Sequence, residues 1–241
     1  MSINYTTYVT QIAGLTNITS NILVTGDANF GPPLPGAIDY AEQRIYREGD
    51  FLSTYITDIS ANVVANQRTF NYPTTSGTFL VIDQLNVFTP AGTTSSNGTR
   101  VPLQVASKHF IDNLYPNDAT SIGVPTYFAP ATATQCFLGP VPDQGYNIEV
   151  IGTQRPAPLS ASNSSTFLTQ TLPDLFVAAT MVYMSGYMRN FGSQADNPQM
   201  AASWESQYEK LSQSADMEEM RKKYASQAWQ NKIPNQFNER K

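Results

Sequence analysis

Residues 171–191, TLPDLFVAATMVYMSGYMRNF, contain the longest apolar run of the chain and decide its fold. The run from Leu175 to Met184 is far shorter than the roughly 20 apolar residues that a membrane-spanning helix needs. Helical spacing predicts a helix with a wide apolar face, formed by Leu175, Phe176, Ala179, Val182, Tyr183 and Tyr187. Thr171 is expected to cap this helix, with Asp174 near the positive end of its dipole. Such a helix must be buried by other elements of the protein.

Helical spacing also occurs near the amino terminus. A short first helix is predicted by Tyr5, Tyr8, Val9, Ile12 and Leu15. After a loop rich in glycine and proline, a second helix is expected from about residue 37 to residue 57. Its apolar face comprises Ile38, Ala41, Ile45, Leu52, Tyr55 and Ile56. Its charged residues are expected on the solvated sides of the helix, and they include Glu42, Arg44, Arg47 and Glu48.

The last helix is expected to begin at Asn197 and Pro198, a cap followed by a proline at the first helical position. One apolar stripe is formed by Trp204, Tyr208, Leu211 and Ala215. Beyond this stripe the helix is polar, with i,i+4 pairs between Glu218 and Lys222 and between Glu219 and Lys223. The interleaved Met217 and Met220 are expected to fill gaps against a neighbour.

Strands are predicted between these helices, from about residue 68 to residue 154. The segment TFLVIDQLNVF is dense in β-branched and aromatic residues, and YNIEVIGTQ alternates apolar with polar residues. One short helix interrupts the strands, with Ser107 as its cap and Pro116 after its end. Residues 126–152 are expected to form a meander of three strands.

The predicted fold class is therefore α+β: a discontinuous helical bundle with an inserted antiparallel β domain, an extended C-terminal helix and a tail. The bundle is assigned to residues 1–60 and 165–227, the β domain to 61–164, and the tail to 228–241. In this arrangement helices cover one face of the central helix and the β insertion covers the other.

The composition excludes several classes of function. Only 14% of the 241 residues are charged and the formal net charge is −5, which argues against a grip on nucleic acid. A surface with so few charges suits a protein that is largely covered by neighbours. The single cysteine, Cys136, is expected to be a small buried hydrophobe. The amino terminus has no signal-peptide pattern, so a soluble intracellular product is expected.

Candidate chemical groups are sparse, and no catalytic, cofactor-binding or metal-binding residue is assigned. His109 is the only histidine, and it is expected at a solvent-facing helix position. Glu42 with Glu48 or Asp50 could provide the paired carboxyl groups of a glycosidase, but they also fit an ordinary solvated helix face. The second interpretation is preferred.

The carboxyl-terminal stretch SQAWQNKIPNQFNERK, residues 226–241, carries apolar anchors that cannot form a core of their own. Trp229, Ile233 and Phe237 are separated by polar side chains, and Pro234 breaks any preceding helix. Large apolar residues on a tail of this kind are typical of anchors that enter a groove on a partner.

Three segments in this order carry a resemblance to a known family: GAIDYAEQRIYREGDF, GVPTYFAPATATQCFLGPVPDQGYNIEVIG and LPDLFVAATMVYMSGYMRNF. The chain resembles the head-to-tail adaptor proteins of short-tailed bacteriophages, which are also called head-completion or tail tubular proteins. The resemblance implies a structural protein of the virion neck, made in the host cytoplasm, that forms a ring, expected to be a dodecamer. It implies binding to the portal protein, carriage of the next tail component (a nozzle or tail tube protein), and passage of DNA through the ring without specific binding.

The resemblance also assigns a role to the tail. Trp229, Ile233, Pro234 and Phe237 are then expected to dock on the portal, and no membrane or cofactor is expected. Two alternatives stay open. Some adaptors of this family double as a peptidoglycan muramidase, with Glu42 and either Glu48 or Asp50 as the candidates here. A carbohydrate-binding β module would instead need exposed aromatic side chains such as Tyr115 or Tyr127.

Overall fold

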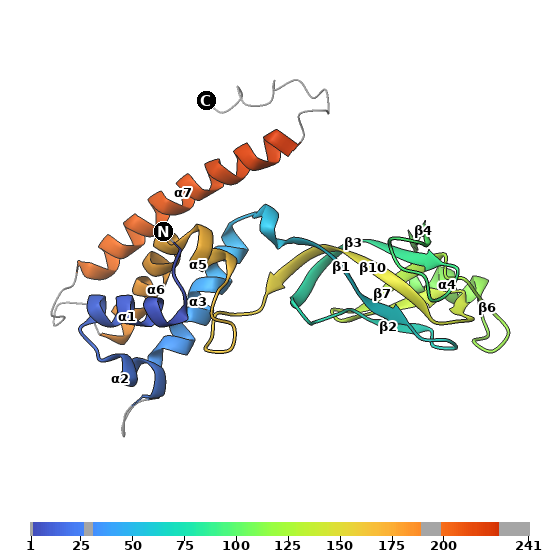
Figure 1. Cartoon of the computed structure of the whole chain (residues 1–241), viewed down its shortest axis with the longest axis horizontal. Coiled ribbons are helices and arrows are strands. Elements are labelled where there is room, and N and C mark those ends of the chain that lie inside the picture. Colours follow the sequence, from blue (N-terminus) through green and yellow to red (C-terminus); the bar gives the residue numbers. More distant parts are fainter. Residues whose placement is uncertain (1, 27–30, 189–198, 227–241) are drawn as a thin grey trace. The chain divides into compact units, whose positions relative to one another are not determined.

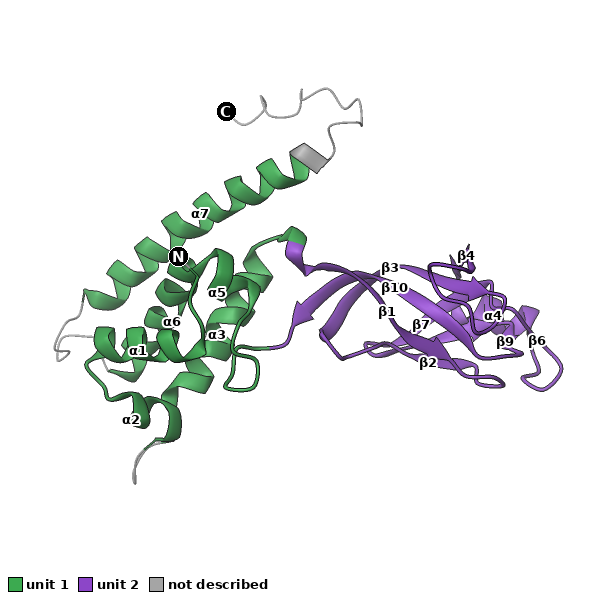
Figure 2. Cartoon of the chain, in the orientation of Figure 1, with its two compact units in different colours: residues 1–52, 158–241 green, residues 53–157 purple. Residues whose placement is uncertain are grey.

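A computed structural model describes residues 2–26, 31–188 and 199–226. The chain divides into two compact units (Figure 2). Unit 1 comprises residues 1–52 and 158–241, and unit 2 comprises residues 53–157. Helices make up unit 1 and strands dominate unit 2 (Figure 1), so the α+β fold class is confirmed.

Unit 1 is built around one central helix. Its helices are α1 (Tyr5–Thr16), α2 (Ser20–Thr25), α3 (Pro33–Glu48), α5 (Phe167–Thr171), α6 (Pro173–Tyr187) and α7 (Met200–Ser226). Most of the apolar side chains of α6 are buried: Leu175, Phe176, Val177, Ala178, Ala179, Met181 and Met184. Tyr8 of α1 stacks on Phe176 with ring centroids 4.7 Å apart. Each large side chain buried in this way stabilises the fold by about 1.5–3 kcal/mol.

The helix α6 packs against other helices of its own unit. The core cluster that contains α6 takes its described residues from α1, α2, α3, α5 and α7 and from the segments around them. The expected cover by the β insertion stays a prediction. The outer residues of the predicted face, Tyr183 and Tyr187, are 42% and 36% exposed.

The start of α6 also differs from the prediction. Thr171 is the last residue of the extra helix α5, and Leu172 is the cap residue of α6. At the start of the short helix α5, the Thr166 N–H donates to Thr169 Oγ1 and the Thr169 hydroxyl donates to the Thr166 carbonyl oxygen, each at 2.9 Å. Asp174 lies in the first turn of α6, as expected.

The helix α3 ends at Glu48 and not near residue 57. At Gly49 the backbone becomes extended, and a Cβ atom there would lie 2.4 Å from the ring of Phe51. Glycine thus lets the chain fold back so that Phe51 is buried against α3. Tyr55 and Ile56, which were expected on the helix, instead begin the first strand. Leu15, assigned to the apolar face of the first helix, is 40% exposed.

Unit 2 contains two four-stranded sheets and a short strand pair. Its elements are β1 (Tyr55–Val63), β2 (Thr69–Asn71), β3 (Gly77–Thr89), β4 (Thr99–Pro102), β5 (Gln104–Val105), α4 (Lys108–Leu114), β6 (Ile122–Gly123), β7 (Tyr127–Thr132), β8 (Gln135–Gly139), β9 (Val141–Pro142) and β10 (Tyr146–Pro156). The sheet orders are β1-β10-β3-β4 and β2-β8-β7-β5, with β6 beside β9. The pairs β5–β7 and β6–β9 are parallel, and the remaining pairs are antiparallel.

The expected three-strand meander is wrong at its last strand. The strands β7 and β8 form the expected hairpin, but β10 leaves it and pairs with β1 and β3 in the other sheet. The apolar residues of both sheets pack into one core that includes Phe70, Leu85, Phe128, Leu138 and Ile148. The predicted helix after Ser107 is confirmed as α4, since the side chain of Ser107 accepts a hydrogen bond from the Phe110 N–H.

Candidate interaction surfaces

The inner face of α7 packs on the other helices of unit 1 through the predicted stripe. Tyr208 and Ala215 are buried, and Trp204 and Leu211 pack against the same core. Their spacing by four, three and four residues follows the helical repeat, so all four face α3 and α6. The long helix is therefore held along its amino-terminal half.

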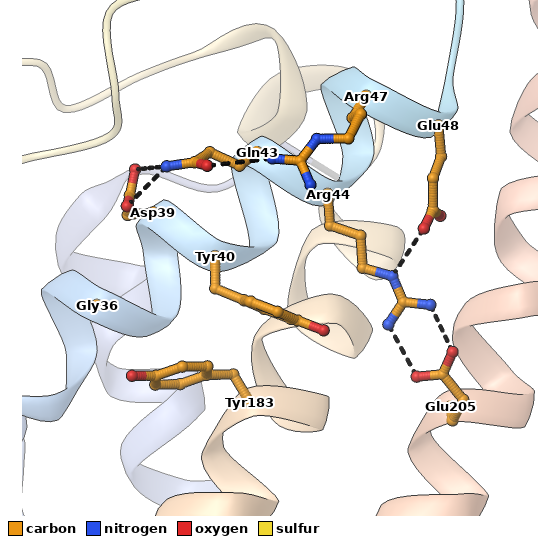
Figure 3. Close-up of a pocket in the computed structure, with 9 residues that line it drawn as sticks. All are labelled: Gly36, Asp39, Tyr40, Gln43, Arg44, Arg47, Glu48, Tyr183 and Glu205. Carbon is orange, nitrogen blue, oxygen red and sulfur yellow. Dashed lines mark hydrogen bonds and ion pairs between the residues drawn. The ribbon is translucent and has the colours of Figure 1, made fainter.

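A charged cluster fastens α7 to α3 beside this stripe (Figure 3). The guanidinium of Arg44 binds both carboxylate oxygens of Glu205 and donates a further hydrogen bond of 3.1 Å to Glu48. Tyr208 donates its hydroxyl hydrogen to Glu48 at 2.5 Å, and the Arg44 guanidinium lies 4.0 Å from the centre of the Tyr208 ring. The hydrogen bonds from Arg44 lower the pKa of Glu205, and burial raises the pKa of Tyr208. Bidentate, charge-assisted bonds of this kind fix the orientation of the helix as well as its position.

A second set of contacts lies two to four turns further along α7. The buried carboxylate of Glu219 accepts a hydrogen bond from the Leu52 N–H at 3.0 Å and one from Lys222 at 2.7 Å. Lys223 pairs with Asp50 and not with Glu219, which corrects the expected i,i+4 pair. The other expected pair, Glu218 with Lys222, is present at 2.8 Å. Charged side chains thus tie the first half of α7 to α3 and its second half to the segment that follows α3.

The outer face of the second half of α7 carries apolar side chains. Met217, Met220 and Tyr224 are 56%, 57% and 53% exposed. Their spacing of three and four residues places them on one stripe, opposite the buried Tyr208–Ala215 side. The expectation that the two methionines fill gaps against a neighbour stays a prediction, and their exposure leaves them accessible to another molecule.

The predicted portal-binding residues follow this stripe in the sequence. Trp229, Ile233, Pro234 and Phe237 lie outside the described residues, so their role remains a prediction. Tyr224, the last residue of the stripe, precedes Trp229 by five residues in the sequence.

A shallow groove of about 760 Å³ lies between α3, α6 and α7 (Figure 3). Tyr40 and Tyr183 face each other there, with ring centroids 5.3 Å apart. The polar side chains of the groove bind one another: Gln43 donates to Asp39 at 2.9 Å and accepts from Arg47 at 3.4 Å. Sequence reasoning missed this groove, although the i,i+4 spacing of Asp39, Gln43 and Arg47 was visible in the sequence.

The three candidate carboxylates do not share one solvent-facing site. Glu42 is only 5% exposed and accepts a hydrogen bond from the Leu159 N–H at 2.9 Å, which corrects its assignment to a solvated face. Burial raises the pKa of Glu42 to about 7. Glu48 is engaged by Arg44 and Tyr208, and Asp50 is engaged by Lys223. Of the three, only Glu48 lines the groove.

The remaining candidates have structural positions. His109 is exposed and lies 3.1 Å from the side chain of Asn113, and Cys136 is buried, both as expected. Burial raises the pKa of Cys136 to about 12, so its thiol stays protonated at neutral pH. Tyr115 and Tyr127 are partly buried, and the centroids of their rings are 6.5 Å apart. The ring centroid of Phe110 is 5.3 Å from that of Tyr127.

In the ranges 2–26, 31–188 and 199–226, no helix is long and apolar enough to cross a membrane. Over the same part of the chain, no three side chains among histidine, cysteine, aspartate and glutamate gather as a metal site would require.

One further group was missed by the sequence reasoning. In unit 2, the buried carboxylate of Glu149 accepts hydrogen bonds from Asn86 at 2.7 Å and from Arg100 at 2.8 Å. Alternation places Tyr146, Ile148 and Val150 on the core side and Glu149 on the opposite face, so the segment YNIEVIG gave no signal that Glu149 is buried. The pair satisfies a buried charge and joins three neighbouring strands, β10, β3 and β4.

The sequence model of the SU10 adaptor protein family matches residues 3–231, which is nearly the whole chain. The chain belongs to this family. The resemblance to bacteriophage adaptors is thereby confirmed, and the chain is an adaptor-type structural protein of a phage virion. The match covers both units and α7, and it includes Trp229 but ends before Ile233. No curated protein matches the chain.

Proposed function

We propose that this SU10-family protein is the head-to-tail adaptor of its phage. In this role it forms a ring, expected to be a dodecamer, that joins the portal to the tail and continues the DNA channel. The observation that carries the proposal is the family match over residues 3–231, together with an α7 whose inner face is fastened to unit 1 and whose outer face is apolar and exposed. A helix that is attached along its inner face can present its outer face to a partner in a fixed orientation.

The carboxyl-terminal end of the chain is proposed to bind the portal. Met217, Met220 and Tyr224 would begin the contact, and Trp229, Ile233, Pro234 and Phe237 would continue it. Exposed methionines and aromatic residues are enriched at protein interfaces, and tryptophan is the commonest hot-spot residue. A nozzle or tail tube protein would bind elsewhere on the ring.

DNA is proposed to pass the ring without being held. The chain has a net charge of −5, and many of its described cationic side chains are paired with carboxylates: Arg44, Arg68, Arg100, Lys108, Lys222 and Lys223. A surface of this kind releases few counterions from DNA, so its affinity for the phosphate backbone is low.

The muramidase alternative receives no support from the positions of its candidate residues. A glycosidase needs one protonated and one ionised carboxyl group on either side of a sugar. Glu42 has the raised pKa of a general acid but is buried against Leu159, and Glu48 is neutralised by Arg44. A peptidoglycan gel with wild-type protein and Glu48→Gln tests this point, since a clear zone that the substitution abolishes would restore the alternative.

The proposed function is tested by co-sedimentation of the full chain with purified portal rings. We expect the chain to be monomeric or weakly associated alone and to form rings on the portal. A truncation that removes residues 228–241 should keep its melting temperature and lose portal binding. A truncation with a lowered melting temperature and unchanged binding per folded molecule would contradict the docking role of the tail.

A further inference from the structure

In the sheet β1-β10-β3-β4, the first part of β1, the first part of β3 and the last part of β10 form a three-stranded ribbon. Each of its two outer strands has one edge without a paired strand among the described residues. We call it the basal ribbon, and it comprises residues 55–59 of β1, 77–84 of β3 and 150–156 of β10. The strand β3 pairs with β10 from Gly77 to Val87, but it pairs with β4 only from Asn86 to Thr89. Figure 1 shows β1, β10 and β3 side by side. On its other side the ribbon ends at β1, for which β10 is the only partner strand among the described residues.

The backbone at both open edges has no strand to bind. Among the described residues, the ladder pairs of Tyr55–Asp58 all lie on the β10 side, and those of Phe79–Gln84 do as well. An unpaired edge offers a row of N–H and C=O groups to another strand. Short edges, bulges and charged side chains commonly block such pairing. The β3 edge is eight residues long, carries one charge, that of Asp83, and has register shifts against β10 between Phe79 and Val81 and between Ile82 and Gln84.

The ribbon exposes apolar side chains near both of its edges. Leu80 and Val81 of β3 are 53% and 54% exposed, at a place where the register between β3 and β10 shifts. On β1, Tyr55 and Ile59 are 50% and 55% exposed. An uncovered apolar strand edge of this length is an aggregation hazard unless a partner occupies it.

A glycine in β10 allows β3 to approach β10 closely near the middle of the ribbon. A Cβ atom at Gly152 of β10 would lie 2.1 Å from the carbonyl oxygen of Val81, so only glycine allows β3 to approach β10 there. Beside β1, a hollow of about 260 Å³ is lined by residues 56–60 and by Thr75 and Ser76. The β1 edge thus has a recess, while the β3 edge has protruding apolar side chains.

We infer that the two edges pair with each other between copies of this chain, so that β1 of one copy lies beside the basal part of β3 of the next. The edges lie on opposite sides of the same ribbon, and a contact between unlike surfaces is head-to-tail, which closes into a ring when the rotation allows it. In a ring of equivalent copies the two strands run in the same direction, because β1 and β3 are both antiparallel to β10. Leu80 or Val81 would enter the recess beside β1 of the neighbour. This inference rests on the proposed ring.

Cysteine crosslinking tests the pairing, because the only natural cysteine, Cys136, is buried. The variants are Thr57→Cys on β1, Val81→Cys on β3 and the double variant, treated with a short bis-maleimide. Adjacent strands lie about 4.8 Å apart, well within the reach of such a reagent. Each variant is treated both as free chain at high concentration and as the fraction that sediments with portal rings.

The double variant should give a ladder of crosslinked oligomers, and an equal mixture of the single variants should give dimers. Neither single variant should crosslink alone, because β1 does not meet β1 in a head-to-tail contact. Crosslinking of a single variant by itself, crosslinking to the portal instead of a second copy, or no crosslinks in either sample would each overturn the inference. Absence of the chain from the portal pellet while the free chain forms the ladder would instead contradict only the proposed portal binding.

A charge placed on the β3 edge provides a second measurement. Val81→Lys should leave the melting temperature unchanged and weaken ring assembly roughly tenfold or more, since a lysine would be desolvated between strands. Val105→Lys is the matched control, an exposed valine on β5 of the other sheet. Equal loss of assembly in both variants would overturn the assignment of the edge.

Discussion

The two faces of α7 use their side chains in opposite ways. The face toward unit 1 contains the buried Glu219 and the ion pair of Glu205, whereas the face toward solvent exposes Met217 and Met220. On an ordinary surface helix the charged groups face water and the apolar groups face the core. The comparison teaches that on α7 buried charges add to the apolar stripe in attaching the helix, and further apolar surface is left for a partner. Each prediction below tests one side of this contrast.

The largest expected difference in stability is between substitutions of two tyrosines of α7, one buried and one exposed. Tyr208 is 1% exposed and bonded to Glu48, while Tyr224, on the same helix, is 53% exposed. Tyr208→Ala should lower the free energy of unfolding by about 4 kcal/mol, through the cavity and the lost hydrogen bond. Tyr224→Ala should change it by less than about 0.5 kcal/mol and should weaken portal binding. Chemical denaturation of both variants measures the stability difference, and similar losses would refute the contrast between the two faces.

The contrast extends to α3, where Glu42 is buried without a cation bound to it. Its pKa is about 7 in the folded protein against about 4.5 in the unfolded chain, so folding favours the protonated form. The stabilisation is present below pH 4.5 and is lost as the pH rises through 7, at about 1.4 kcal/mol per pKa unit, which amounts to about 3 kcal/mol.

Glu42→Gln keeps an acceptor for the Leu159 N–H and removes this titration. The variant should match the wild type near pH 4.5 and exceed its stability at pH 8. Comparing urea midpoints of the two proteins across this range cancels the other titrating groups. A pH-independent difference between them would show that Glu42 is not the cause.

Substitutions of the proposed docking anchors test whether the apolar residues of the tail bind the portal. Trp229→Ala should weaken portal binding by about 2 kcal/mol or more with no loss of stability. Asn235→Ala, a polar neighbour in the same tail, is the control and should have a much smaller effect. Titration of portal rings with each variant gives the affinities, and equal effects would argue against a specific anchor at Trp229.

The sequence predicted the features that depend on residues close together along the chain. The Trp204–Ala215 stripe follows from the helical repeat alone, and Ser107 caps α4 through a group three residues away. The burial of Glu42 could not be predicted, because its partner Leu159 lies 117 residues along the chain. For the same reason Glu219 was paired with Lys223 in the prediction, whereas its actual partners include the backbone of Leu52. The strand β10 was misplaced because alternation predicts a strand but not the sheet that it joins.

The smallest expected difference is between alanine substitutions of two adjacent glutamates on α7, Glu218 and Glu219. Both substitutions change helix propensity equally, so the comparison isolates the contacts of each carboxylate. Glu219 is buried and accepts hydrogen bonds from the Leu52 N–H and from Lys222, while the side chain of Glu218 is 51% exposed and contacts Lys222 alone. Glu219→Ala leaves a backbone donor without its acceptor, which costs about 1–2 kcal/mol. Glu218→Ala removes one exposed i,i+4 pair and should cost about 0.3 kcal/mol, a cost that added salt should reduce. Because Lys222 contacts both carboxylates, it keeps one partner in either variant. The difference between the two variants therefore reports the bond to Leu52, and two equal losses would mean that this bond does not hold α7 to the segment after α3.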